Sequence, residues 1–218
     1  MPLQLYEKEK ILDSCFEVFV LHGYVKTSTV MLAEAAGISK ALIFHHFGSK
    51  KKLYISILER CFDKMSPELN QEAPLVSDDF FEAKEENGLK SIEYMRKNPQ
   101  VNKLLFEAFY STPDEVKPEI LKFKVYIEKK YGPLKAGRES QMMNLFKQIP
   151  FRDGVDPREA YELIQVVSEH FRMKLAAELT DTDKLYDDEY WKVFFKKKNS
   201  FLDMVRYGIE PQTFKGEE

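Results

Sequence analysis

Apolar side chains recur along this chain at spacings of three and four positions, the spacing that brings them onto one face of an α-helix. The first such stretch predicts an amphipathic helix over about residues 5–22. Its apolar positions are Ile11, Leu12, Cys15, Phe16 and Phe19. A second stretch runs from Ser49 to about Met65. We find no convincing period-two alternation of the kind that a half-buried strand would give, so the pattern predicts an all-α fold.

Five more helical stretches follow, separated by glycine and proline. They cover about residues 78–98, 99–110, 118–149, 157–179 and 189–207. Asn98-Pro99 separates the first two, because a residue before proline is pushed out of the α region. Asp156-Pro157 marks a helix start, since proline is favoured at the first helical position. Gly132-Pro133 predicts a bend or a split into two helices.

Between the first two stretches lie two short helical patterns separated by a turn. Thr27 or Ser28 can cap the first, because a hydroxyl accepts a hydrogen bond from a free N–H of the opening turn. Gly37 follows its last residue, where a left-handed backbone is needed. Ser39 caps the next helix, residues 40–47. This is the spacing of a helix-turn-helix, whose second helix enters the DNA major groove, although a generic helical hairpin would show the same caps.

Short motifs make this pattern more specific. They read HGY at 22–24, AEAAGISK at 33–40, FHHF at 44–47, SK at 49–50 and LY at 53–54. Together they resemble the DNA-binding domain of the tetracycline-repressor-like (TetR) family over roughly the first quarter of the chain. The remaining three quarters are interpreted from their helix pattern alone.

The resemblance implies a homodimeric, all-helical transcriptional regulator of about nine helices, acting as a repressor under the control of a small molecule. We expect an N-terminal three-helix helix-turn-helix DNA-binding domain at residues 1–48. A C-terminal helical domain for ligand binding and dimerisation is expected at residues 49–218. The implied partners are double-stranded operator DNA, a second copy of the chain, and an apolar or aromatic effector of unknown identity. No cofactor is expected.

Candidate DNA contacts lie mainly on one face of the second motif helix. Ile43 and Phe47 are four positions apart and are predicted to face the core, which leaves the opposite face for DNA. There an aromatic edge can touch a thymine methyl group, and an imidazole can donate to a phosphate or a base acceptor. The alternative for Phe44 is ordinary core packing. The predicted contact residues are Ser28, Thr29, Lys40, Ala41, Phe44, His45, His46 and Lys50.

The motif departs from the family pattern at several positions. Phe44 stands where relatives usually have tyrosine, so a phenol-to-phosphate hydrogen bond is not expected. Lys51 and Lys52 replace typically acidic residues at the start of the next helix, where each cation costs about 0.3–1 kcal/mol. A nearby phosphate would explain these lysines, and a solvated cluster would explain them equally well.

The charge distribution agrees with local contact to DNA. The whole chain has a formal net charge of −3, which argues against a protein that coats nucleic acid without specificity. Residues 22–54, however, carry five lysines, one glutamate and three of the four histidines. A small basic segment on an acidic body is the expected electrostatic pattern of a sequence-specific DNA-binding protein.

The last two helical stretches carry more apolar residues than a single face needs. A helix on the surface of a monomer buries one apolar face, so a second apolar face indicates contact with a larger core or with a second subunit. The family resemblance favours the second subunit. The predicted dimer interface consists of Leu163, Val166, Met173, Trp191, Phe194, Phe195, Phe201, Leu202 and Val205.

The C-terminal part also contains residues that could line an apolar cavity with a few polar groups. The ligand prediction depends on the resemblance, because each of these residues taken alone is better explained as core. The candidates are Met95, Phe106, Phe109, Tyr110, Tyr126, Met142, Met143, Phe146, His170 and Phe171.

Other classes of protein find little support. We see no nucleophile–base pair, paired carboxylates, phosphate loop or metal-ligand spacing, so no enzyme and no metal site are expected. Cys15 and Cys61 fall on apolar helix faces, which predicts buried free thiols. With no apolar signal core and no span of roughly 18 uncharged apolar residues, we expect a cytoplasmic protein without membrane segments. The main alternative is an all-helical protein-interaction module that does not bind DNA.

Overall fold

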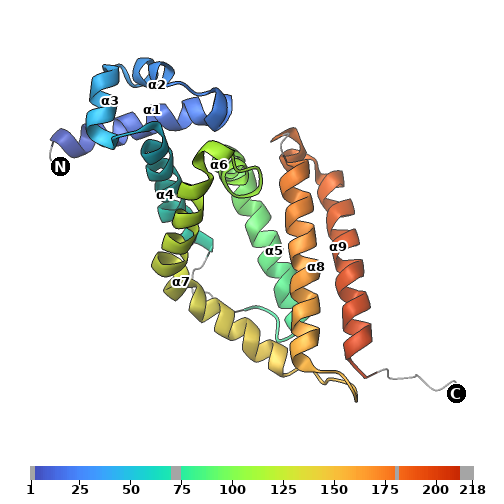
Figure 1. Ribbon diagram of the computed structural model, residues 1–218. Helices are drawn as coiled ribbons and strands as arrows, with labels where there is room; N and C mark the ends of the chain where they lie inside the picture. Colours follow the sequence, from blue (N-terminus) through green and yellow to red (C-terminus); the bar gives the residue numbers. More distant parts are fainter. Residues whose placement is uncertain (1–2, 70–74, 180–181, 212–218) are drawn as a thin grey trace, which may run out of the picture. The chain divides into compact units, whose positions relative to one another are not determined.

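The computed structural model describes residues 3–69, 75–179 and 182–211, and these form nine α-helices, two short 3-10 helices and no strand (Figure 1). The fold is therefore all-α, as the sequence predicts. The helices are α1 (Leu3–Lys26), α2 (Thr29–Ala36), α3 (Lys40–Phe47), α4 (Lys50–Leu69), α5 (Phe80–Lys97), α6 (Pro99–Tyr110), α7 (Lys117–Lys147), α8 (Pro157–Glu178) and α9 (Asp188–Ile209). The 3-10 helices are η1 (Asp114–Val116) and η2 (Thr182–Tyr186).

The chain divides into two compact units, and the division differs from the predicted domains. The first unit comprises Met1–Gln71 and Asn98–Lys135, and the second comprises Glu72–Lys97 and Ala136–Glu218. Helices α4 and α6 and the first part of α7 thus pack with the N-terminal helices. A compact unit need not be a functional domain. The predicted boundary between a DNA-binding and a ligand-binding domain, at residues 48 and 49, therefore stays a prediction.

Aromatic residues and buried thiols form the core of the first unit. Phe19 packs edge-on to Tyr54 at 5.0 Å between ring centroids, and Tyr24 packs edge-on to the same ring at 4.9 Å. Cys15 and Cys61 are buried free thiols, as expected from their apolar helix faces. Burial raises the pKa of Cys15 to about 12 and that of Cys61 to about 11, so both stay protonated and act as small apolar groups.

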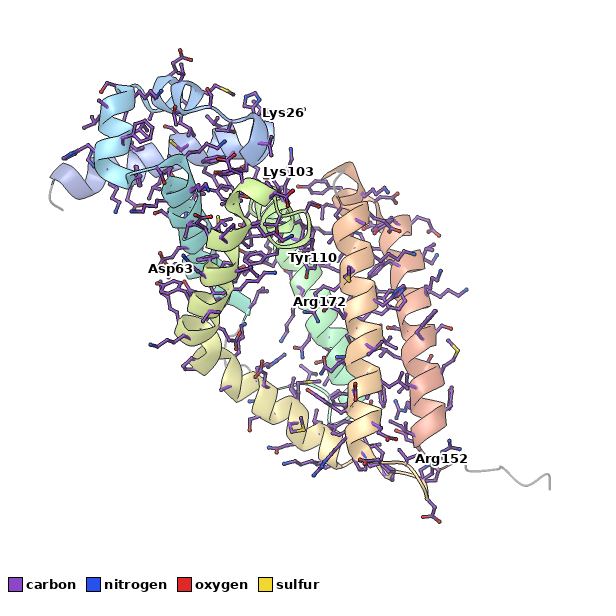
Figure 2. All side chains as sticks on the ribbon, in the orientation of Figure 1. Lys26, Asp63, Lys103, Tyr110, Arg152 and Arg172 are labelled. Carbon is purple, nitrogen blue, oxygen red and sulfur yellow. The ribbon has the colours of Figure 1, made fainter. Side chains whose placement is uncertain are left out.

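At two predicted interruptions the helix continues through a proline. Of the bend or split predicted at Gly132-Pro133, the split into two helices is therefore wrong. Helix α7 continues through Pro133, although proline removes one N–H and crowds the preceding turn. Contacts with α4 hold the preceding turn of α7: Lys130 Nζ lies 2.9 Å from Asp63 Oδ1, and Tyr131 donates to the same oxygen at 2.7 Å (Figure 2). Helix α4 likewise runs through Pro67 to Leu69, where a loop was predicted. The rest of that predicted loop, residues 70–74, lies outside the described residues.

The second unit is built around a core of α5, α7, α8 and α9. Phe146 of α7 lies 5.4 Å from Phe80 and 5.0 Å from Tyr161, measured between ring centroids. Ile164 and Leu202 are buried beside them. Among the described residues, no helix is both long and apolar enough to cross a membrane.

One carboxylate joins two ends of this second unit. Asp79 Oδ1 accepts hydrogen bonds from the Phe81 and Glu82 N–H groups at 2.9 and 3.0 Å, which caps α5. Arg206 of α9 donates to both oxygens of the same carboxylate, at 3.2 and 2.8 Å. The guanidinium also lies 5.3 Å from the Phe81 ring. Asp79 therefore ties the start of α5 to the end of α9.

We predict that Asp79→Ala lowers the free energy of unfolding by about 1 kcal/mol more than Asp79→Asn, because asparagine can still cap the helix. Arg206→Met keeps the cap and removes the ion pair with Asp79, together with the contacts of Arg206 with Glu210 and Phe81, so it should cost at least as much as Asp79→Asn. Urea denaturation of the three variants measures the difference. Equal losses for Asp79→Ala and Asp79→Asn would show that the cap contributes nothing.

Candidate DNA-binding site

Two capped helices form the helix-turn-helix, with the boundaries that the sequence predicts. Ser28 is the cap of α2, and its hydroxyl accepts from the Met31 N–H at 3.2 Å. Gly37 ends α2 in the left-handed conformation, and Ser39 caps α3 by accepting from the Leu42 N–H at 3.2 Å. Thr27, the other possible cap, is buried instead and donates to the Gly23 carbonyl at 2.7 Å.

Helix α3 buries one face and exposes the other. Ile43 and Phe47 are buried in the core of the first unit. Lys40, Ala41 and His45 are exposed, as is Phe44, which leaves 38% of its surface accessible. The exposure of Phe44 argues against the core alternative. Ser28 is also exposed, and Thr29 and His46 are partly exposed.

The exposed face of α3 carries a cation on an aromatic surface. The Lys40 ammonium lies 5.9 Å from the centre of the Phe44 ring, and the His45 and His46 rings lie 5.5 Å apart. Next to them, the small Ala41 side chain leaves room for another molecule to approach the helix. Such a surface can offer hydrogen-bond donors and positive charge to phosphates, and an aromatic edge to a base.

The three lysines after α3 have different environments. Lys50 Nζ lies 4.1 Å from the centre of the Tyr24 ring, a cation–π contact inside the first unit. Lys51 forms an ion pair of 3.8 Å with Glu119 of α7. Lys52 is exposed and donates its N–H to the Ser49 hydroxyl at 3.1 Å. The ion pair shows that Lys51 has a partner within the protein. Lys50 packs on Tyr24, whether or not it also contacts a DNA phosphate.

The orientation of the motif depends on a backbone break that sequence reasoning did not identify. Gly23 has φ 71° and ψ 171°, a region almost exclusive to glycine, and it interrupts α1. The following N–H, on Tyr24, donates to Glu107 Oε1 of α6 at 2.9 Å, and the Tyr54 hydroxyl donates to Glu107 Oε2 at 3.5 Å. Burial, followed by the charge of Glu107, raises the pKa of Tyr54 above its usual range. In the sequence, the HGY motif at residues 22–24 was the only indication of this backbone break.

The predicted pocket residues are distributed over both units. Phe106, Phe109, Tyr110 and Tyr126 belong to the first unit, where Phe109 packs on Phe62. In the second unit are Met95, Met142, Met143, Phe146, His170 and Phe171. Phe146 and Phe171 are buried there, and His170 is exposed. Their convergence on one cavity stays a prediction.

The predicted dimer residues fall into two groups. Leu163, Val166, Met173 and Phe201 are exposed. The others are buried in the second unit or nearly so, and little of their surface is available to a partner: Trp191, Phe194, Phe195, Leu202 and Val205. Sequence periodicity identified both apolar faces of each helix, but it could not say which one the chain itself covers.

Comparison with known proteins agrees with the helix-turn-helix geometry. Residues 11–57 match the family of bacterial regulatory proteins called the tetR family. The match concerns the N-terminal helices, so residues 11–57 carry a DNA-binding domain of the tetR type. The HTH-type transcriptional activator FasR of Mycolicibacterium smegmatis is 30% identical over 113 residues, which is 51% of this chain and 50% of FasR. The negative transcriptional regulator IcaR of the biofilm operon icaADBC, from Staphylococcus aureus, is 36% identical over 59 residues, or 27% of this chain and 32% of IcaR. The alignments thus span half or less of these curated relatives.

Solved structures extend the likeness in fold over more than nine tenths of the chain. MexZ, a repressor from Pseudomonas aeruginosa, aligns with a TM-score of 0.60 and 20% identity, covering 96% of this chain and 97% of MexZ. FadR from Bacillus subtilis, solved in complex with stearoyl-CoA, aligns with a TM-score of 0.52 and 17% identity, covering 93% of this chain and all of FadR. At these identities the likeness concerns the fold.

We predict that Gly23→Ala destabilises the protein more than Gly37→Ala, although both residues have positive φ. At Gly37 an added Cβ has no neighbour within 4 Å, so only backbone strain of about 1 kcal/mol is expected. At Gly23 the Cβ would stand 2.8 Å from Glu107 Oε1, so the carboxylate must move and its hydrogen bond, worth about 1 kcal/mol more, is lost.

Chemical denaturation of both variants, alone and combined with Glu107→Ala, checks this explanation. In the Glu107→Ala background, the additional cost of Gly23→Ala should shrink because the carboxylate is gone. A cost independent of residue 107 would rule out the proposed clash.

Proposed function

We propose that this protein is a transcriptional repressor that binds operator DNA as a homodimer and responds to a small molecule. The observation that carries the proposal is the face of α3, where Lys40, Ala41, Phe44 and His45 are exposed on a helix anchored by buried residues. A helix of this kind fits the major groove of DNA, where cations meet phosphates and an aromatic edge meets a thymine methyl group. As a regulator rather than an enzyme, it acts in the cytoplasm, where bacterial DNA lies.

The exposed apolar residues of α8 and α9 support the homodimer. Leu163, Val166 and Met173 share one stripe of α8 by their spacing, and Val193 and Met204 share one of α9. Each leaves about half of its surface or more accessible. Exposed apolar stripes on neighbouring helices are typical of a surface that a second subunit covers. A two-fold dimer would place two α3 helices on successive major grooves, about 34–36 Å apart.

The effector is proposed to bind among the C-terminal helices, and an apolar or aromatic body would suit the candidate pocket residues. FadR of Bacillus subtilis, which has a similar fold, was solved with stearoyl-CoA. That complex supports the capacity of this fold to hold an organic ligand and does not identify the ligand of this chain.

A gel-shift assay on DNA upstream of the protein's own gene tests operator binding directly, since regulators of this class often act on their own or a neighbouring promoter. A reporter fused to that promoter then tests the direction of control, with higher expression expected when the protein is removed. Lower expression on removal would make it an activator, as FasR is named.

Lys40→Ala is predicted to weaken operator binding and to reduce the steepness of its salt dependence. Each lost phosphate contact lowers the slope of log affinity against log salt by about 0.9, and a dimer loses two contacts. Lys40 is a sharper test than Lys50, because Lys50 also packs on Tyr24. Lys64→Ala, an exposed lysine on α4, is the control and should leave the slope unchanged. An equal slope for Lys40→Ala and the wild type would place Lys40 away from phosphate.

Val166→Asp and Met173→Asp are predicted to convert the dimer to monomer and to abolish operator binding. Each side chain leaves 59% of its surface exposed in the protomer, so the protomer can still fold, whereas a charge buried without a partner in an interface costs several kcal/mol. Analytical ultracentrifugation and circular dichroism measure assembly and folding separately.

Val125→Asp provides the matched control for the dimer test, because Val125 is an exposed apolar residue of α7 that belongs to neither stripe. It should remain dimeric. If the variants at positions 166 and 173 also remain dimeric, the α8 stripe is not the interface. Substitutions at Trp191 or Phe194 are less informative, since both are buried and their loss would damage the protomer itself.

A further inference from the structure

One face of α5 in the second unit is lined with polar groups where a core would be expected. Lys84, Asn87, Gly88 and Ser91 share this face by their spacing of three and four residues. Lys198 of α9 reaches it: a Cβ built on Gly88 would lie 3.0 Å from Lys198 Nζ and 3.5 Å from the Phe195 ring. The absence of a side chain at position 88 therefore leaves space for the Lys198 ammonium.

Two further cations approach the same face. Arg172 extends from α8 on the side that faces α5 (Figure 2), and its charge acts on Lys84. Arg172 is exposed and also forms an ion pair of 3.1 Å with Glu169 on its own helix. Arg138 of α7 donates to Asn87 Oδ1 at 3.0 Å. Four helices of the second unit thus direct basic side chains at one place. We call Lys84, Lys198 and Arg172 the cationic cluster.

The two lysines of the cationic cluster lack a carboxylate partner. Across residues 3–69, 75–179 and 182–211, neither ammonium makes a hydrogen bond or an ion pair, and each instead lies near an aromatic ring. Lys84 Nζ is 6.0 Å from the Phe80 ring centre, and Lys198 Nζ is 5.6 Å from that of Phe195. Glu85 acts on Lys198 electrostatically, but its Oε1 accepts from Asn199 at 2.7 Å.

This arrangement costs free energy when no anion is present. Burial, then the charges of Lys198 and Arg172, lowers the pKa of Lys84 to about 8. Burial also lowers the pKa of Lys198. Partly buried charges of one sign are normally compensated by a counter-charge, because desolvation and mutual repulsion both oppose the charged form. A bound anion would supply that compensation.

We propose that the cationic cluster binds the anionic group of a small molecule, a carboxylate or a phosphate. The two ammonium groups would supply point charges beside the Phe80 and Phe195 rings, and Arg172, one nitrogen of which pairs with Glu169, would add a further guanidinium donor. The aromatic neighbours favour a ligand whose anionic group is attached to an apolar body. The cluster gives the effector of the proposed regulator a chemical class, and in that respect the inference rests on the proposed function.

Thermal unfolding and calorimetry of the full-length protein test the site with defined probes. The probes are inorganic phosphate, hexanoate and uncharged 1-hexanol, each added at constant ionic strength held by chloride. We expect phosphate or hexanoate to raise the melting temperature in a saturable way, and 1-hexanol to have a much smaller effect. Saturation by phosphate alone would identify a phosphate site, and saturation by hexanoate alone a carboxylate site. A melting temperature unchanged by both anions would overturn the proposal.

Lys84→Met and Lys198→Met separate an anion site from a structural role. Each is expected to weaken binding of the active probe by about tenfold, the loss expected from one charge-assisted hydrogen bond. Without the probe, each variant should melt at or above the wild-type temperature, because a repulsive, partly buried charge has been removed. Lys90→Met on α5 and Lys196→Met on α9 are exposed controls and should keep wild-type binding. Unchanged probe binding in both cluster variants, or a lower melting temperature without the probe, would contradict the proposal.

Operator binding, measured in chloride without either probe, separates a failure of the anion site from a failure of the proposed regulator function. If wild-type protein binds operator DNA but neither anion, the proposed function survives and the anion site is wrong. If the protein binds an anion at the cluster but no DNA, the site stands and the regulator assignment fails.

Discussion

Glu107 places a carboxylate against the backbone of Gly23 and Tyr24, where α1 is interrupted shortly before the helix-turn-helix. Its two oxygens accept from the Tyr24 N–H and the Tyr54 hydroxyl, so α1, α4 and α6 meet at one charged group. A Cβ at residue 23 would lie 2.8 Å from Glu107 Oε1, so any side chain there would displace the carboxylate. The position of α2 and α3 on the rest of the first unit depends on this contact, and a displacement of α6 would act on it directly.

The second unit depends on a different constraint. Helices α8 and α9 each have two apolar faces, and only one of them is buried within the unit. Helices α8 and α9 turn Ile164, Phe171, Trp191 and Leu202 inward and leave Val166 and its neighbours exposed. The inner surface of this unit is not uniformly apolar. The cationic cluster lies beside its aromatic side chains and makes the ligand-free state less stable than a fully apolar core would be. If the cluster binds an anion as proposed, stability and ligand recognition oppose each other at this site.

Local rules predicted most helix boundaries well. The caps Ser28, Ser39 and Asp156 act as expected, because a cap is a hydrogen bond between neighbours in sequence. Proline was less reliable. Pro99 and Pro157 begin helices as expected, whereas α7 continues through Pro133. There the contacts of Lys130 and Tyr131 with α4 join residues about seventy positions apart, and they offset the local cost of the proline that had suggested a bend or a split.

The sequence by itself determined the all-α class, the helix-turn-helix and the residues on the outer face of α3. These features follow from spacing and from contacts within a few residues. Only the tertiary structure decided which apolar face of α8 and α9 the chain covers, that Thr27 is buried, and that Glu107 meets Gly23. It also brought Lys84, Arg172 and Lys198 together from three helices. The physical reason is that burial and electrostatic interaction depend on distance in space, and for residues far apart in sequence that distance is set by packing.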